Sequence, residues 1–217
     1  MPPSPSSNSL LHSRRAAQNY SEVSSVIIVV RHGQTEWNVN KRLQGWADSP
    51  LTPLGVEQAH HVAKRLQELI QGRPAMLHCS PLGRTLTTAD IIATRLGEGV
   101  EIQVDPRLKE YSFGHWQGFT TEQVKSEFSL EWQQRQADKW NYVIPDGESY
   151  ALVSDRSQHW LNSLSDEAAV IAVTHQMTGR TIRGAYLGLS HEHTMALAHE
   201  NHQICVLDNG QEQIVDV

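Results

Sequence analysis

The chain has 217 residues, of which 39% are hydrophobic and 19% charged, a composition typical of a globular protein with one substantial core. Its net charge of −6 at pH 7 gives no overall field that would attract nucleic acid or an anionic membrane. We therefore expect one domain, and any phosphate must be captured by a local group of residues.

Residues 1–25 differ from the rest of the chain. Pro, Ser and Asn dominate them, so we expect a disordered tail. Arg14 and Arg15 among many serines resemble part of an organelle transit peptide, but the segment has no apolar stretch of the kind found in a secretory signal. A plain tail on a cytoplasmic protein is the interpretation we favour.

The next segments alternate between strand and helix. Residues 26–30 are a continuous β-branched apolar run, typical of a strand buried on both faces of a parallel sheet, and far shorter than the ~20 residues that span a bilayer. The spacing predicts a helix over residues 52–70, with Thr52 as its cap. Residues 75–79 form a second predicted strand, and Ser80 and Pro81 open a helix that reaches about Leu96. This alternation predicts a largely parallel sheet.

The second half of the chain contains a break in this pattern. A short strand over residues 101–104 is followed by an aromatic and polar stretch, residues 105–149, which we interpret as an insertion covering the sheet edge and the active-site rim. The remaining elements are a helix over 149–164, a strand over 169–173, a helix over 177–187, and strands over 194–198 and 204–207. We predict an α/β three-layer sandwich, with a mostly parallel mixed sheet flanked by helices, over residues 26–217. Cys79 and Cys205 lie in predicted strands and are expected to be reduced and buried.

Polar side chains follow four of the predicted strands at the edge where ligands bind in open α/β sheets. Arg31 and His32 follow the first strand, Arg84 the second, Glu110 the third and His175 the fourth. Because the carboxyl ends of parallel strands meet at one edge, we expect these side chains to converge.

These residue types suit phosphoryl transfer, which needs a nucleophile, charge compensation and a proton for the leaving oxygen. Neutral imidazole has a free lone pair near pH 7, so His32 is the candidate nucleophile. Arg31 and Arg84 offer guanidinium groups that match phosphate oxygens, and a protonated His175 would add another donor. Glu110 is the candidate proton donor.

Several motifs resemble the histidine phosphatase superfamily, in its phosphoglycerate mutase-like branch (branch 1). The resemblance covers residues 26–207. The blocks that carry it are residues 31–38, residues 43–55, Ser80 to Thr85 with Thr88 and Ala89, Leu108 to Glu110, residues 114–118, Pro145 to Ser149, and Thr174 with His175.

The resemblance implies a role for each of these residues. His32 would be phosphorylated, Arg31, Arg84 and His175 would bind the phosphate, and Glu110 would donate a proton. Family members need no cofactor, and the resemblance also assigns phosphate and substrate binding to Asn38 and Gln44. Two positions depart from the family pattern: Gln176 replaces a usual Gly and could alter substrate shape, and Gln117 replaces a frequent Glu.

The favoured hypothesis is a metal-independent phosphatase that hydrolyses a small phosphorylated metabolite through a phosphohistidine. Phosphoglycerate mutase activity is the first alternative, although the insertion lacks the basic, tyrosine-bearing segment with which the glycolytic mutases retain a bisphosphate. A family member that binds phosphorylated ligands without turnover is the second. Neither nucleic acid nor membrane is expected as a partner, and a homodimer is left open.

Plainer interpretations exist for several residues. Asn38 and Gln44 could simply cap loops. Among the tryptophans, Trp46 is the best candidate for contact with substrate, because it lies on the loop beside the predicted pocket. His191, His193, His199 and His202 look like a metal cluster, but no known ligand spacing accompanies them. Residues 199–205 resemble a late turn and strand of the same family, with His193 and His199 expected to be partly exposed.

Overall fold

The computed structural model describes residues 26–165 and 168–217. The predictions of a disordered tail and a transit peptide fall on residues 1–25 and therefore lie outside the described residues. Within the described part, no helix is long and apolar enough to cross a membrane.

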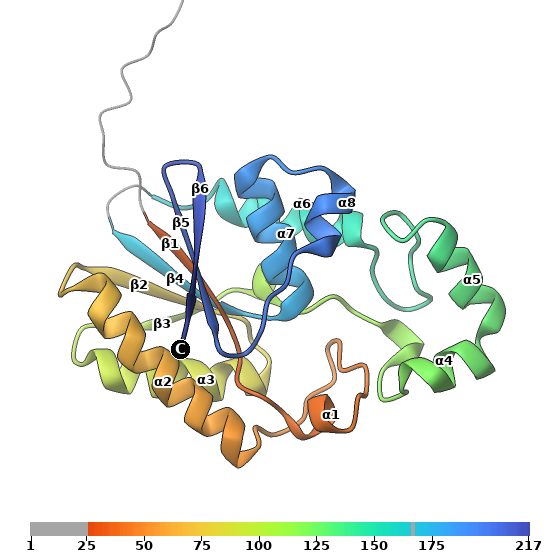
Figure 1. Ribbon diagram of the computed structural model, residues 1–217, viewed down its shortest axis with the longest axis horizontal. Coiled ribbons are helices and arrows are strands. Elements are labelled where there is room, and N and C mark those ends of the chain that lie inside the picture. The colour runs from red at the N-terminus through yellow and green to blue at the C-terminus, as the bar shows by residue number, and fades with distance from the viewer. Residues whose placement is uncertain (1–25, 166–167) are drawn as a thin grey trace, which may run out of the picture.

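A mixed sheet of six strands forms the centre of the molecule, in the order β3-β2-β4-β1-β5-β6 (Figure 1). The first four strands in that order run parallel, whereas β5 pairs antiparallel with β1, and β6 antiparallel with β5. This topology confirms the predicted mostly parallel sheet. The strands are β1 (Ile27–Arg31), β2 (Ala75–Cys79), β3 (Ile102–Val104), β4 (Ala169–Thr174), β5 (Gln203–Asp208) and β6 (Gln211–Asp216).

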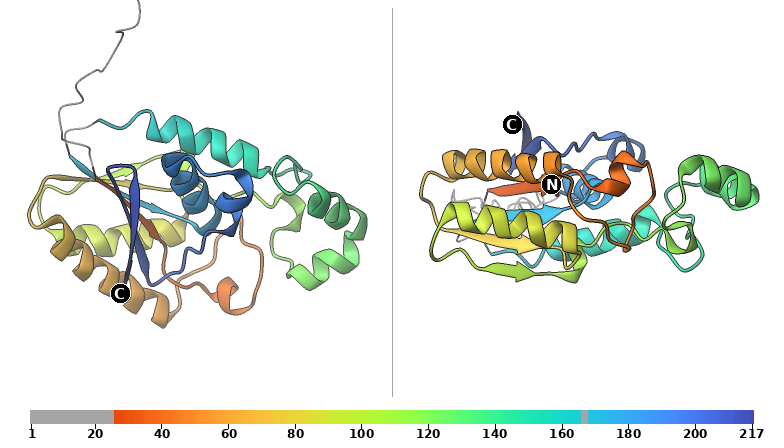
Figure 2. Two further views of the ribbon diagram at one scale, coloured as in Figure 1. Left: turned by 45° about the horizontal axis from the view of Figure 1, so that its top comes forward. Right: turned by 90° about the horizontal axis from the view of Figure 1, so that it is seen from below.

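Helices cover both faces of the sheet, as the two-sided burial of β1 requires (Figures 1 and 2). Ile28 and Val30 point into a core shared with α2 and α3. Ile27 and Val29 point the opposite way, into a core shared with α6 and α7. A strand buried on both faces has no polar alternation, which explains its continuous apolar sequence. The covering helices are α2 (Pro53–Ile70), α3 (Gly83–Leu96), α6 (Tyr150–Leu161) and α7 (Gln176–Leu187).

The helix boundaries follow their caps. The Thr52 hydroxyl accepts a hydrogen bond from the Gly55 N–H at 3.0 Å, so α2 begins where the sequence predicted. By contrast, α3 begins at Gly83, two residues after Pro81, and Leu82 at its cap position makes no side-chain cap. The later start leaves Ser80 on the loop between β2 and α3, at the edge of the sheet that carries the candidate residues.

Residues 105–149 are called the cap from here on. Figure 2 shows its helices α4 and α5 at one end of the molecule, beyond the layers of the sandwich. Two backbone hydrogen bonds, of 2.9 and 2.8 Å, join Leu43 to Phe119 and Gly118, so the cap is tied to the loop after β1. The cap contains the short 3₁₀ turns Pro106–Leu108 and Gly114–Trp116, α4 (Thr121–Glu127) and α5 (Ser129–Ala137).

The predicted strand over residues 194–198 is wrong, because that segment lies largely within α8 (His191–Ala196). The Ser190 hydroxyl caps α8 by accepting from the His193 N–H, and Thr194 packs so tightly on α7 that a Cβ at Gly184 would lie 2.2 Å from its hydroxyl oxygen. The predicted strand over residues 204–207 is confirmed as β5. The final strand, β6, was not predicted because its polar sequence lies exposed at the sheet edge.

The loop after β1 is pressed against the start of α2. A Cβ on Gly55 would lie 2.0 Å from the carbonyl oxygen of Gln34, closer than any real Cβ contact. We expect Gly55→Ala to lower the free energy of unfolding by about 1–3 kcal/mol, because neither backbone can move away freely. Urea denaturation measures this. Leu54→Ala alters the same helical turn at an exposed position and should cost less; equal losses in both variants would contradict the close contact.

Candidate active site

His32 lies directly after β1 and is 3% exposed. Its Nδ1 lies 2.7 Å from the carbonyl oxygen of Gly33, and its Nε2 lies 3.2 Å from the Nε of Arg84. A carbonyl only accepts and a guanidinium only donates, so Nδ1 carries the ring proton and Nε2 has the lone pair. This is the tautomer in which Nε2 can act as a nucleophile.

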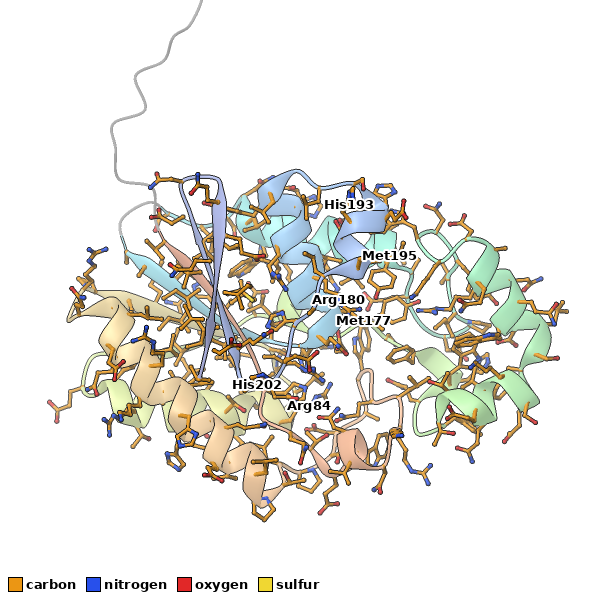
Figure 3. The ribbon with its side chains drawn as sticks, viewed as in Figure 1. Arg84, Met177, Arg180, His193, Met195 and His202 are labelled. Carbon is orange, nitrogen blue, oxygen red and sulfur yellow. The ribbon has the colours of Figure 1, made fainter. Side chains whose placement is uncertain are left out.

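Arg84, on the first turn of α3, is 2% exposed and fixed by the loop that follows β1 (Figure 3). Its two terminal nitrogens donate to the carbonyl oxygens of Ala47 at 2.9 Å and Gly45 at 2.8 Å. The carboxylate of Asp48 lies 3.1 Å from the first of them. Gly45 has a φ of +54°, a left-handed conformation that glycine adopts without strain, and this turns its carbonyl toward Arg84. The guanidinium therefore points inward to His32, as predicted.

His175 precedes α7 and faces His32, with 5.1 Å between the ring centroids and an interplanar angle of 62°. Its Nε2 is joined to the hydroxyl of Ser80 at 2.8 Å. Its Nδ1 is buried and has no hydrogen-bond partner among the described residues. The sequence did not assign Ser80 a place in the site, although its position after β2 is the kind of signal that could have identified it.

Burial and nearby positive charge favour the neutral form of both imidazoles. Burial places the pKa of His32 well below its usual range, and the charges of Arg84 and Arg31 lower it further. Burial also lowers the pKa of His175 strongly, again with the charge of Arg84 acting in the same direction. Because water is excluded and the neighbours are cationic, protonation of either ring requires a nearby anion.

Arg31 ends β1 and is anchored by a turn near the C-terminus. One of its terminal nitrogens donates to the carbonyl oxygen of His199 at 2.9 Å and lies 3.9 Å from the carboxylate of Glu200. Asn201, in the same turn, donates from its amide to the carbonyl oxygen of His32 at 2.5 Å. The sequence predicted a turn here but not its contacts with Arg31 and His32. It also placed His199 partly at the surface, which is wrong, because the ring is fully buried against Gly179.

Glu110 is buried at the start of α7. One carboxylate oxygen accepts from the backbone N–H groups of Tyr111 at 2.9 Å, Met177 at 3.2 Å and Thr178 at 3.3 Å. The N-terminus of a helix favours negative charge, which explains why a carboxylate lies there. Trp46 donates from its indole N–H to the Glu110 carbonyl oxygen at 2.7 Å, so it contacts the backbone of a candidate residue.

The remaining predicted residues are Asn38, Gln44 and Gln176. Asn38 is used locally, because its side-chain oxygen accepts from the Thr35 N–H at 3.0 Å to complete a capping box on α1 (Glu36–Val39). Gln44 is buried and donates to the Thr35 hydroxyl at 2.7 Å, while its side-chain oxygen has no partner among the described residues. Gln176 is half-buried at the start of α7, and its side chain makes no hydrogen bond within the described part of the chain.

The four histidines between residues 191 and 202 lie in different surroundings. His199 is buried, as described above. His191 stacks on Trp140 with 3.8 Å between centroids, His193 bonds to Ser190, and His202 is exposed. Across residues 26–165 and 168–217, no three His, Cys, Asp or Glu side chains gather where they could share a metal ion.

The model of the histidine phosphatase superfamily, branch 1, matches residues 27–215, which is nearly all of the described chain. The chain belongs to this superfamily. Its members and structural neighbours are phosphatases and mutases, so the chain is an enzyme of this kind.

Relatives and solved structures agree on the family and differ in activity. The "probable phosphoglycerate mutase GpmB" of Proteus mirabilis is 36% identical over 177 residues, which is 75% of each chain. The mycobacterial glucosyl-3-phosphoglycerate phosphatase superposes with a TM-score of 0.72 at 27% identity, covering 88% of this chain and 97% of the other. The α-ribazole phosphatase of Shigella flexneri shares the fold, with a TM-score of 0.76 at 23% identity, covering 88% and 95%.

The neutral, buried histidines predict a loss of stability in mild acid. Burial lowers the pKa of His32, His175 and His199 in the folded state, so below about pH 6.5 the unfolded chain binds protons that the folded chain does not. Each such histidine should cost about 1.4 kcal/mol per pH unit in the free energy of unfolding. Urea denaturation at pH 7.5 and 5.5 checks this. Equal stability at the two pH values would contradict the buried neutral rings.

Proposed function

We propose that the protein is a metal-independent phosphatase that hydrolyses a small phosphorylated metabolite through a phosphohistidine at His32. The observation that carries the proposal is the pair of contacts on that ring, 2.7 Å to Gly33 and 3.2 Å to Arg84. The Nε2 lone pair accepts from Arg84, and when substrate binds this N–H turns to a phosphate oxygen, which frees the lone pair for attack. A nucleophile and its charge compensation are thus fixed before any substrate binds.

In the first step, Nε2 of His32 attacks phosphorus and the bond from phosphorus to the ester oxygen breaks. Arg31, Arg84 and His175 bind the phosphate oxygens and offset the charge that develops on them. Glu110 in its protonated form gives its proton to the leaving oxygen, so the product departs as an alcohol. In the second step, water attacks the phosphohistidine while Glu110 accepts a proton from it. Inorganic phosphate leaves and His32 is restored.

A mutase is the second candidate, and the names of the relatives that are 36% and 32% identical favour it. A mutase would use the same five residues but return the phosphoryl group to the bound product before water attacks. Stimulation by a bisphosphate primer, with the substrate isomerised and no phosphate released, would mark that activity. A non-catalytic ligand-binding role is the third alternative. The chain argues against it because it retains all five candidate catalytic residues, Arg31, His32, Arg84, Glu110 and His175.

The proposal predicts that His32→Ala lowers phosphate release from 4-nitrophenyl phosphate by about 10⁴-fold or more, because it removes the nitrogen that attacks phosphorus. His61→Ala is the matched control, since it removes an exposed histidine in the middle of α2 that is not among the candidate site residues. Circular dichroism should show both variants folded. Activity close to that of the unaltered enzyme in folded His32→Ala would exclude the mechanism.

A further inference from the structure

The turn that orients Arg84 is itself held from the cap. Residues 44–47 form this turn, and two of its carbonyl oxygens accept from the terminal nitrogens of Arg84. The side-chain oxygen of Gln117, in the cap, accepts from the Trp46 N–H at 2.5 Å and from the Ala47 N–H at 3.2 Å. Two backbone donors of the turn therefore meet on one oxygen atom of the cap.

The peptide group between residues 45 and 46 joins Gln117 to Arg84. Its N–H belongs to Trp46 and donates to Gln117, while its carbonyl belongs to Gly45 and accepts from Nη2 of Arg84 at 2.8 Å. A trans peptide group is planar, and its N–H and C=O point in opposite directions. The acceptor on one side of this plane therefore fixes the direction of the carbonyl on the other side.

Glycine at position 45 is required for this contact. Its φ is +54°, and a Cβ there would lie 2.5 Å from the side-chain oxygen of Gln117, closer than any real Cβ contact. Because Gly45 has no Cβ, the amide of Gln117 can lie directly against the turn. The same residue thus allows both the left-handed turn and the approach of the side chain that holds it.

The backbone next to Gln117 is anchored on the loop after β1. The Gly118 N–H donates to the Leu43 carbonyl oxygen at 2.8 Å, and the Leu43 N–H donates to the Phe119 carbonyl oxygen at 2.9 Å. The Gln117 side chain is half-buried, and within the described part of the chain its amide nitrogen donates no hydrogen bond. The oxygen is therefore the atom through which this side chain acts.

Trp46 extends the connection to the proposed proton donor. Its indole N–H donates to the carbonyl oxygen of Glu110 at 2.7 Å, and the ammonium of Lys109 lies 4.3 Å from the ring centroid. The turn that Gln117 holds thus contacts Arg84 on one side and the backbone of Glu110 on the other. These are the groups that would bind the phosphate and protonate the leaving oxygen.

We infer that Gln117 is a positioning residue for phosphate binding, because its side-chain oxygen orients the 45–46 peptide and this peptide directs Arg84 toward the phosphate. Without the acceptor the peptide can rotate, and the guanidinium then loses one of the two carbonyls that hold it. The inference rests on the proposed phosphatase function and deepens it, since it adds a residue of the cap to the groups that act on phosphate.

The test compares two substitutions at this position. Gln117→Met keeps the length of the side chain and removes its oxygen, whereas Gln117→Glu keeps an oxygen acceptor. Calorimetry with inorganic phosphate should show about tenfold weaker binding in Gln117→Met, the effect of about one hydrogen bond, and recovery of most of this loss in Gln117→Glu. A salt concentration of about 0.15 M screens the charge that Glu adds. The kcat/KM for 4-nitrophenyl phosphate should follow the same order.

Gln123→Met is the matched control. The side-chain oxygen of Gln123 also accepts a backbone N–H, that of Thr120 at 2.8 Å, but this hydrogen bond is confined to the cap. The control should bind phosphate as the unaltered enzyme does. Circular dichroism checks that each variant folds, and Gln117→Asn, which withdraws the oxygen by one methylene, takes the place of an unfolded Gln117→Met.

A double-mutant cycle tests whether the effect of Gln117 passes through Arg84. In an Arg84→Gln background, Gln117→Met should lower kcat/KM by less than about twofold, because the guanidinium that the turn directs is absent. The inference is overturned if Gln117→Met binds phosphate as tightly as the unaltered enzyme, if Gln117→Glu recovers nothing, or if the loss is undiminished in the Arg84→Gln background. An equal loss in Gln123→Met would assign the effect to a general loosening of the cap and would also overturn it.

Binding of inorganic phosphate requires no turnover, so this inference and the proposed phosphatase function fail separately. If no phosphomonoester is hydrolysed but phosphate binding depends on the oxygen at position 117, the phosphatase proposal fails and the positioning role stands. If hydrolysis depends on His32 while Gln117→Met binds phosphate unchanged, only the positioning role fails.

Discussion

The site depends on the burial of two guanidinium groups whose ion-pair carboxylates are half-exposed to solvent. The side chain of Arg84 is 1% exposed while that of its partner Asp48 is 42% exposed, and the side chains of Arg31 and Glu200 are 9% and 48% exposed. Solvent screens these acids, so they offset the buried charge only in part. Burial accordingly lowers the pKa of both arginines. A phosphate dianion between them would supply the missing negative charge.

Segments from separate parts of the chain hold the buried site residues in place. The parallel strands β1, β2 and β4 bring Arg31, Ser80 and His175 to one edge, and each is followed by a loop or helix packed on the sheet. Backbone carbonyls of residues 45 and 47 orient Arg84, and the first N–H groups of α7 orient Glu110. Backbone groups do not change rotamer, so the geometry is set before substrate arrives.

The sequence predicted the parallel sheet and the position of most site residues. The apolar run of β1 indicated burial on both faces, and the residues after each parallel strand were expected to lie at the same end of the sheet. The sequence failed where tertiary contacts decided the outcome. The segment around Thr194 resembles a strand but is held as a short helix by Ser190 and by its contact with Gly184. The contacts by which the turn at residues 199–201 anchors Arg31 and His32 join positions far apart in the chain, which periodicity does not detect.

The central claim is that phosphorus passes through Nε2 of His32. Mixing the enzyme with 4-nitrophenyl phosphate, quenching within milliseconds in alkali and mapping the peptides by tandem mass spectrometry tests it directly, because a nitrogen–phosphorus bond survives base. The account predicts a phosphoryl group on the peptide that contains His32, and a phosphorus–proton NMR correlation that assigns it to Nε2. A burst of nitrophenol with no phosphorylated peptide, or with the label on another residue, would contradict it.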